Sequence, residues 1–342
     1  MSPEEEGLLR VIQINGAIAL PMVIKTAIEL DLFEIMAKTP NGQFSSFDLA
    51  SCLPTQNSEA PSLIERILRF LASQSILTST LIRDEHGNSK TLYGMTPLSN
   101  NYVRNQDGTS LASSVLLIYD KILVDCWYHL KDAVVDGGVP FNKAHGVNAF
   151  EYPAKDNRFN TVFNKCMYDN TTIFMKMILG KYKGFEEVKQ LVDVGGGLGA
   201  NLDIIVSKYP YIKGVDHVGG DMFKSVPKGD VIFMKWILHD WGDNYCITVL
   251  KNCWAALPHS GKVVVVVEMI IPEPENQPSD ATGNDVSKAA ISGDMIMLVT
   301  NPGGKERTIK EYNILAKKSG FTSLKIVCRV SMFWVMEFYK NA

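Results

Sequence analysis

Apolar residues recur at helical spacing near the start of the chain. Between residues 21 and 36, Val23, Ile24, Ala27 and Ile28 fall on one face, while charged residues fall elsewhere. A second run of this kind lies at 63–71, and two short β-like runs follow it, separated by the turn-forming residues 84–88. The pattern predicts amphipathic helices followed by a β-hairpin, which is typical of a winged-helix unit.

The middle of the chain is dominated by helical patterns. We expect helices at 111–135 and 158–182, separated by a break at the segment Gly137-Gly138-Val139-Pro140. The break suggests two domains, because 342 residues exceed the usual size of one. We therefore expect a helical, winged-helix-like dimerisation domain at 1–136 and a ligand-binding domain at 137–342.

From residue 190 onward, short buried runs alternate with helical segments. The β-like runs lie at 191–194, 212–215, 231–234 and 263–268, with helices expected at 202–208 and 245–257. This alternation predicts an α/β domain with a Rossmann-like parallel sheet. The final runs, 324–330 and 333–339, are joined too closely for a crossover helix, so they should form an antiparallel carboxyl-terminal edge.

Charge and hydropathy limit the partners that the chain can have. The net charge is −3 and charged residues make up 21%, so no basic excess favours nucleic acid. No unbroken apolar run reaches the ~18 residues that span a bilayer, and the acidic start does not resemble a signal peptide. We expect a soluble, cytoplasmic protein without a membrane partner that binds a small molecule. The apolar helices from about Leu8 to Met36 would expose a large hydrophobic surface in a monomer, which favours a homodimer.

A glycine cluster follows the first strand of the predicted sheet. The sequence Leu191-Val192-Asp193-Val194-Gly195-Gly196-Gly197-Leu198-Gly199 places it between a buried strand and a helix, where open α/β sheets bind ligands. A dinucleotide site has a similar fingerprint, and a tight turn without a ligand is the other alternative. Asp193 favours a cationic ligand without phosphate, such as a sulfonium cofactor with a free amino group.

Three motifs that follow the glycine cluster are more specific than the glycines alone. They are Gly219-Gly220-Asp221-Met222-Phe223, then Phe233-Met234-Lys235-Trp236-Ile237-Leu238-His239-Asp240-Trp241, then Asn301-Pro302-Gly303-Gly304-Lys305-Glu306-Arg307-Thr308. In this order they resemble the plant S-adenosylmethionine-dependent phenolic O-methyltransferases of the caffeic acid O-methyltransferase type. The similarity extends over nearly the whole chain.

The resemblance implies a catalytic set and a cofactor site. His239 matches the general base of the family, and Glu268 and Glu306 match the two glutamates beside it. A phenol with a pKa near ~10 is protonated at neutral pH, so a base of pKa ~6.5 can accelerate its methylation about 10²–10⁴-fold. Gly195, Asp221, Met222 and Lys235 would contact S-adenosylmethionine, and Trp241 would add aromatic packing. The scattered histidines and carboxylates offer no metal site, so we expect a metal-free reaction.

The resemblance also places the acceptor pocket, and here the chain departs from the caffeate enzymes. Apolar Ile118 replaces an amide and Asn170 replaces a histidine, which weakens the case for a hydroxycinnamate acceptor. A phenylpropanoid, a flavonoid or another small aromatic remains open, as does an aromatic amine. Retention of the acid-base set favours oxygen as the methylated atom. The substrate-binding residues implied are Ile118, Phe159, Phe163, Met167, Asn170, Met297 and Asn301, with Leu117, Leu123 and Ile296 also lining the pocket.

One segment of the family is missing from the chain. Somewhat under twenty residues, including an acid that holds the ribose hydroxyls, should separate Val215 from Asp216. Asp216 lies 21 positions after Gly195 but begins the connection to the next strand, so it is a poor substitute. We hypothesise that the full protein has the segment. The alternative is a cofactor-deficient dimer partner that keeps the fold without catalysis.

Overall fold

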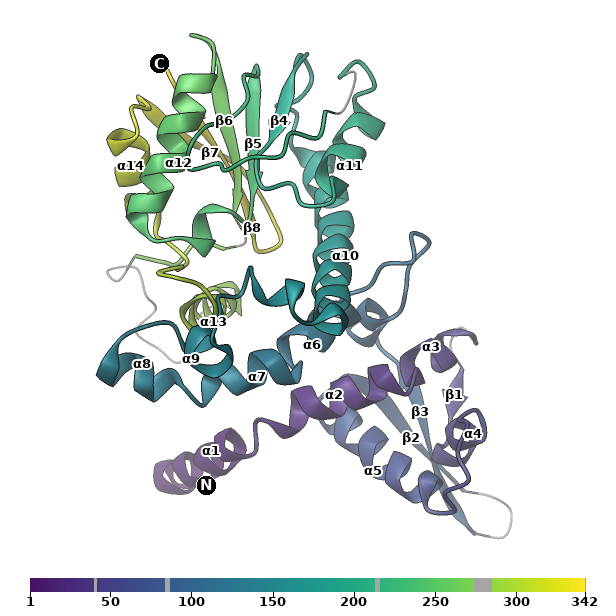
Figure 1. Cartoon of the computed structure of the whole chain (residues 1–342). Helices are drawn as coiled ribbons and strands as arrows, with labels where there is room; N and C mark the ends of the chain where they lie inside the picture. The colour runs from purple at the N-terminus through teal and green to yellow at the C-terminus, as the bar shows by residue number, and fades with distance from the viewer. Residues whose placement is uncertain (40–41, 84–86, 213–215, 268, 274–284, 342) are drawn as a thin grey trace. The chain divides into compact units, whose positions relative to one another are not determined.

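The computed structural model describes residues 1–39, 42–83, 87–212, 216–267, 269–273 and 285–341. They form two compact units, one made of residues 1–121 and 161–170 and the other of residues 122–160 and 171–342 (Figure 1). The long helix α10 (Asn157–Lys181) supplies residues to both. The predicted domain boundary at residue 136 stays a prediction.

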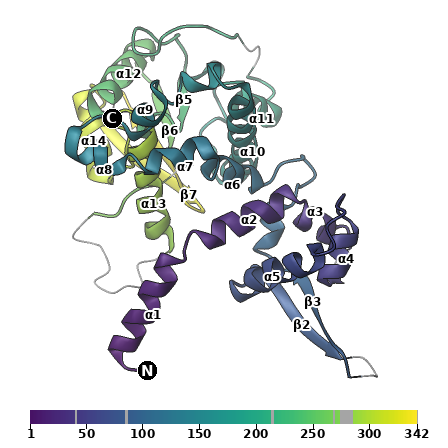
Figure 2. The same cartoon turned by 60° about the horizontal axis from the view of Figure 1, so that its bottom comes forward.

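The first unit combines short helices with a small antiparallel sheet. Its strands are β1 (Gln43–Phe44), β2 (Leu77–Arg83) and β3 (Ser89–Met95), in the order β1-β3-β2. Its helices are α1 (Pro3–Asn15), α2 (Ala19–Glu29), α3 (Leu32–Ala37), α4 (Ser46–Ser51), α5 (Ala60–Ser73), η1 (Ser99–Tyr102) and α6 (Ala112–Ile118). The β2–β3 hairpin follows α5, as the sequence predicted, and projects beyond the helices in Figure 2.

The helix expected at 21–36 is divided in two. Asp31 adopts a left-handed conformation with φ of 52°, so the backbone turns between α2 and α3. The apolar spacing continues across the turn, and residues of both helices enter one core with Leu68 and Leu71 of α5. The apolar periodicity therefore predicted the buried face correctly, but it did not predict the break in the helix at Asp31.

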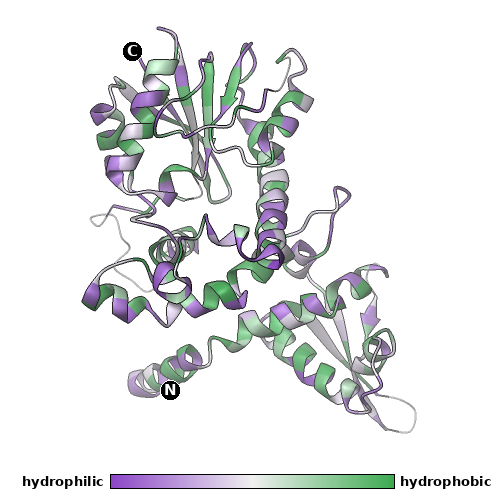
Figure 3. Ribbon diagram, viewed as in Figure 1, coloured by the Kyte–Doolittle hydropathy of each residue, from purple (hydrophilic) through white to green (hydrophobic). Residues whose placement is uncertain are grey.

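The amino-terminal helices expose most of their apolar residues. Leu8, Val11, Ile12 and Ile14 of α1 are each more than half exposed, and Figure 3 shows the resulting alternation of hydrophobic and hydrophilic residues along α1. By length and composition, the helical stretch Pro3–Glu29 is apolar enough to cross a membrane, and 6% of its most apolar window is buried within the protein. Polar residues interrupt this stretch, so the criterion of an unbroken apolar run did not predict it. The absence of a membrane partner stays a prediction.

The helical region expected at 111–135 consists of three short helices. They are α6, α7 (Lys121–Trp127) and α8 (Leu130–Asp136). The second helix carries Cys126, which is fully buried with Phe141 of α9 (Pro140–His145) and Val299 of α13 (Asp285–Thr300). These three residues form a small core of their own in the second unit.

The second unit contains the predicted Rossmann-like sheet. Its strands are β4 (Leu191–Asp193), β5 (Val231–Lys235), β6 (Lys262–Val267), β7 (Ser323–Val330) and β8 (Phe333–Tyr339), in the order β4-β5-β6-β8-β7. The first three are parallel, and β8 pairs antiparallel with both β6 and β7. The predicted antiparallel edge is therefore confirmed.

Helices cover both faces of this sheet. Ile232 and Met234 of β5 pack in one core with α12 (Asp243–Ala256) and α14 (Ile309–Lys318). Phe233 points to the opposite face, where its ring lies 5.9 Å from that of Phe185. In Figure 1, α10 and α11 (Ala200–Lys208) lie on the side of the sheet away from α12 and α14.

The strand expected at 212–215 has no counterpart among the described residues. Ile212 is buried in a turn after α11, and residues 213–215 lie outside the described part of the chain. Among the described strands, β4 is consequently at an edge of the sheet.

Candidate active site

The glycine cluster forms a loop between β4 and α11. Gly195, Gly197 and Gly199 all have positive φ values, of 71°, 55° and 86°. A Cβ atom on Gly195 would lie 2.3 Å from Cδ1 of Ile237, so a side chain there would overlap it. Glycine is favoured at this position because its φ is left-handed and because any Cβ atom would displace the end of the Ile237 side chain.

Asp193 ends β4 immediately before this loop and is partly buried, with its Oδ1 atom shielded from solvent. Its Oδ2 accepts a hydrogen bond from Nδ2 of Asn201 at 3.3 Å, whereas Oδ1 has no hydrogen-bond partner among the described residues. Burial raises the pKa of Asp193 to about 7, and the hydrogen bond from Asn201 and the charge of Lys235 oppose the shift. An unpartnered buried oxygen beside a glycine-rich loop fits a cationic group of a bound ligand. The residues present therefore fit the ammonium end of S-adenosylmethionine.

Lys235 and Trp236 follow at the end of the neighbouring strand, β5. The Lys235 side chain is buried, and its Nζ donates a hydrogen bond to Oγ1 of Thr171 at 3.0 Å. Trp236 has a φ of 57°, and its buried Nε1 has no hydrogen-bond partner among the described residues. A left-handed tryptophan costs about 1–3 kcal/mol, a strain that clusters at functional sites.

The other two predicted cofactor residues occupy a turn before β5. Asp221 is exposed, its Oδ1 accepts from the Phe223 amide at 3.0 Å, and it forms an ion pair with Lys224 at 3.7 Å. Met222 is half-buried against the core shared with α12. Their contact with a cofactor stays a prediction.

Trp241, also expected near the cofactor, belongs to an aromatic cluster. Its ring stacks on Phe150 at a centroid distance of 5.3 Å and meets the edge of Phe223 at 4.9 Å. Tyr245 of α12 completes the cluster, 5.5 Å from Trp241. This packing fixes the loop that follows η3 (Leu238–Asp240).

His239 lies in η3 with its side chain almost completely buried. Its Nδ1 is 2.8 Å from Oε1 of Glu306, which is 1% exposed in the loop before α14. The second oxygen of that carboxylate, Oε2, is buried without a hydrogen-bond partner among the described residues. The structure thus brings together two residues that are 67 positions apart. Glu268, the third predicted catalytic residue, lies outside the described residues.

Two further carboxylates surround this pair. Oδ1 of Asp240 is 3.6 Å from Nε2 of His239 and accepts a hydrogen bond from Nδ2 of Asn301 at 2.6 Å. Burial raises the pKa of Asp240 to about 6, and His239 opposes the shift. Oδ1 of Asp294 accepts from the backbone N–H of Glu306 at 2.9 Å, which fixes the segment carrying that glutamate. A buried imidazole held between carboxylates can accept and release a proton.

Two family models match the chain. The model of the O-methyltransferase domain matches residues 127–217 and 211–322, and that of the O-methyltransferase dimerisation domain matches residues 12–105. The chain belongs to the S-adenosylmethionine-dependent O-methyltransferases. The predicted fold class and family are confirmed.

Relatives and solved structures agree with this assignment. Caffeic acid 3-O-methyltransferase of Rosa chinensis is 52% identical over 356 aligned positions, covering 99% of this chain and 96% of the relative. Myricetin 3-O-methyltransferase 3 of Solanum habrochaites is 48% identical, covering 98% and 96%. Human N-acetylserotonin methyltransferase, solved in complex with SAM, covers 100% of both chains with a TM-score of 0.81 and 22% identity. The last likeness concerns the fold alone.

Two findings bear on the segment predicted to be missing from this O-methyltransferase. The alignment with the Rosa chinensis enzyme spans 356 positions, which exceeds the 342 residues of the chain. The domain match is also divided into two parts that meet at residues 211–217. Both findings agree with a deletion between Val215 and Asp216. Asp216 is exposed, and a role for it in ribose binding stays untested.

The predicted acceptor residues lie in both units. Phe159, Phe163, Met167 and Asn170 are spaced at four, four and three residues along α10, so they share one helix face. In the second unit, Asn301 contacts Asp240, and its Nδ2 lies 3.3 Å from Sδ of Met297. Ile118 ends α6 in the first unit. Their contact with an acceptor stays a prediction.

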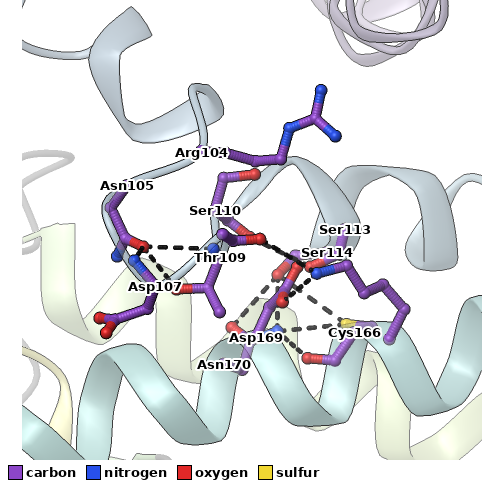
Figure 4. Close-up of polar contacts among 12 residues, drawn as sticks. Arg104, Asn105, Asp107, Thr109, Ser110, Ser113, Ser114, Cys166, Asp169 and Asn170 are labelled. Atoms are coloured by element: carbon purple, nitrogen blue, oxygen red, sulfur yellow. Dashed lines mark hydrogen bonds and ion pairs between the residues drawn. The ribbon is translucent and has the colours of Figure 1, made fainter.

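Asn170 is held by a polar partner in the first unit. Its Nδ2 donates to Oγ of Ser114 at 2.8 Å and to the carbonyl of Cys166 at 2.9 Å, as Figure 4 shows. Its Oδ1 in turn lies 3.2 Å from the same serine hydroxyl. The amide is therefore fixed in orientation by α6.

Some residues of the site were absent from the predicted set. Asp240 and Arg307 stood within the quoted motifs, and Asp193 was used only to favour a cationic ligand. Asp294 had no sequence signal, because its role is to accept a backbone hydrogen bond across a loop. Within the described residues, no group of three or more potential metal ligands lies together, and the metal-free reaction stays a prediction.

Proposed function

We propose that this enzyme transfers the methyl group of S-adenosylmethionine to a phenolic hydroxyl of a small aromatic acceptor, with His239 as the general base. The observation that carries the proposal is the buried pair of His239 and Glu306, 2.8 Å apart. The names of the relatives, which include caffeic acid and myricetin O-methyltransferases, support a phenylpropanoid or flavonoid acceptor.

The proposed role of Glu306 follows from the geometry of the pair. With Nδ1–H donating to Oε1 of Glu306, Nε2 is the nitrogen that takes the proton from the acceptor hydroxyl. The carboxylate then stabilises the imidazolium, because the two opposite charges are close in a buried setting. The resemblance implies that Glu268 supports the same proton transfer. No metal takes part in this proton transfer.

The cofactor site has two ends in this proposal. Asp193 binds the ammonium group, and Gly195 allows the backbone to approach the ligand closely. Asp221 and Met222 lie toward the adenine, and Lys235 lies toward the polar part. When bound, the cofactor supplies a methyl group on a positively charged sulfur. The contribution of the chain is alignment of the acceptor and removal of its proton.

The remaining features of the proposal concern partners. The dimerisation domain and the exposed apolar residues of α1 support a homodimer. We further propose a cytoplasmic enzyme without a nucleic-acid or membrane partner. The acceptor pocket uses Ile118, Phe159, Phe163, Met167, Asn170, Met297 and Asn301.

The test is the substitution His239→Asn. We expect kcat to fall about 10²–10⁴-fold, because the general base is lost, while the Kd of S-adenosylhomocysteine stays within about twofold. His259→Asn, at an exposed histidine outside the site, is the matched control and should leave kcat unchanged. Full activity of His239→Asn would contradict the proposed base, and with an aromatic amine it would favour nitrogen as the acceptor atom.

The shorter chain favours a second candidate function, a dimer partner that does not bind the cofactor. The split family match at 211–217 is the observation behind it. Calorimetric titration of the folded protein with S-adenosylhomocysteine separates the two candidates. Micromolar binding supports the enzyme, and no binding supports the partner.

A further inference from the structure

Arg307 is fully buried beside the proposed catalytic pair. It follows Glu306 directly in the loop before α14, and its side chain is 0% exposed. A buried guanidinium is stable only when its donors are satisfied and its charge is balanced. The partners of Arg307 therefore indicate what this residue holds in place.

The guanidinium bridges the two ends of the segment that carries His239. Nη1 donates to the carbonyl of Leu238 at 2.6 Å, and Nη2 donates to the carbonyl of Trp241 at 2.7 Å. These carbonyls lie on either side of the pair His239 and Asp240. The position of the imidazole along its loop is thus fixed from both ends by one side chain.

Asp243 at the start of α12 balances the charge. Its Oδ1 accepts from Nη2 at 2.8 Å and from Nε at 3.1 Å. Arg307 holds the pKa of Asp243 below its usual range, against the effect of burial. The aspartate itself is half exposed, so it is an accessible end of the buried network.

Backbone contacts connect the same two loops. The N–H of Lys305 donates to the carbonyl of His239 at 2.9 Å. A Cβ on Gly304 would lie 2.8 Å from that carbonyl oxygen and 2.9 Å from the carbonyl oxygen of Asp240, so the loops approach more closely than a side chain would allow. Residues 304–307 therefore form one continuous support for the His239 segment.

We propose that Arg307 is a positioning residue that keeps Nδ1 of His239 at hydrogen-bond distance from Glu306. This inference rests on the proposed function of that pair. Arginine suits the task because its planar group donates to several acceptors in fixed directions, whereas a lysine ammonium is a single point. Arg307→Lys keeps the charge but loses the simultaneous bonds to both carbonyls.

The first experiment does not depend on activity. In protein labelled with ¹⁵N-histidine, the Nδ1 proton of His239 should give a downfield NMR signal that is absent from His239→Asn. We expect Arg307→Lys to raise the exchange rate of this proton with water at least about tenfold. Arg329→Lys, on the exposed surface of β7, is the matched control and should leave the rate unchanged. An unchanged rate in Arg307→Lys, or no such signal in the native protein, would overturn the proposal.

Asp243→Asn covers the case in which Arg307→Lys does not fold. This substitution weakens the hydrogen bonds between Asp243 and Arg307. It should also raise the exchange rate of the His239 Nδ1 proton, by a smaller factor than Arg307→Lys. No change in a folded Asp243→Asn protein would count against the proposal.

Kinetics then separate positioning from a general structural role. Arg307→Lys should lower kcat at least about fivefold, with the KM for S-adenosylmethionine within twofold. In the His239→Asn background the same substitution should cost less than twofold, because the group it positions is gone. Equal losses in both backgrounds would contradict the proposal. Full activity of His239→Asn would instead refute the proposed base, while the NMR result still decides whether Arg307 holds the imidazole.

Discussion

Two carboxylates of the site differ in the chemistry of their bonded partner. In each, one oxygen has no hydrogen-bond partner among the described residues. The other oxygen of Glu306 faces the imidazole of His239, which can carry a positive charge, whereas that of Asp193 accepts a hydrogen bond from the neutral amide of Asn201. Desolvation favours the protonated form of an acid, and a nearby cation favours the ionised form. Asp193 is therefore suited to ionise when a cationic ligand arrives, while Glu306 faces an imidazole of the protein itself.

The raised pKa of Asp193 gives the first prediction at this scale. The folded protein retains a proton that the unfolded chain loses near pH 4, so this group makes stability fall as pH rises from about 4 to 7. A ligand ammonium binds the ionised carboxylate. The affinity for S-adenosylhomocysteine should therefore rise about tenfold between pH 6 and pH 8, as measured by calorimetry.

Two variants test the origin of this pH dependence. Asp193→Asn should bind the ligand more weakly and with little dependence on pH. Asp203→Asn, at an exposed aspartate of α11, should behave like the native protein. The assignment fails if Asp193→Asn retains the full pH dependence.

At the scale of elements, hydrophobic periodicity predicted what was buried better than where elements end. The strands from β4 to β8 were found because short apolar runs alternate with helices. The helix predicted at 21–36 is broken at Asp31, since a left-handed residue leaves no trace in the apolar spacing. The helix α13 escaped prediction, and apolar residues are distributed around it rather than gathered on one face.

Only those residues of the site that belong to a recognisable sequence motif could be predicted. Resemblance identified His239 and Glu306, and the structure places them in contact. The resemblance did not give the role of Arg307. Its guanidinium donates hydrogen bonds to the backbone carbonyls of Leu238 and Trp241 in another loop. Because every residue has a backbone carbonyl, the side chains of that loop carry no signal of this contact. Contacts between a side chain and a distant backbone group cannot be predicted from a single sequence.

The start of α14 gives a prediction for an element. Thr308 and Glu311 form a capping box, in which each side chain accepts a hydrogen bond from the backbone N–H of the other. Thr308→Ala should lower the free energy of unfolding by ~1 kcal/mol, measured by urea denaturation. Thr248→Ala in the exposed middle of α12 should change it by less than about 0.5 kcal/mol. Equal effects of the two substitutions would argue against the cap.

At the scale of the whole molecule, the exposed apolar residues of α1 need a partner surface. Ile12 is 59% exposed and lies at the start of the matched dimerisation domain. We expect the native protein to be a dimer and Ile12→Glu to shift it toward monomer at micromolar concentration, because a charge in an apolar interface is costly. Light scattering after size-exclusion chromatography measures this, with Gln13→Glu on the same helix as the control. A monomeric native protein would refute the prediction.

The most direct test of the account is methyl transfer itself. Protein whose intact mass agrees with the 38.0 kDa of this sequence is incubated with S-adenosylmethionine carrying a labelled methyl group and a panel of small phenols, and the label on oxygen is measured. The account predicts labelled methyl ether from the native protein and about 10²–10⁴-fold slower formation with His239→Asn. A folded native protein that transfers no label to any phenol would contradict it.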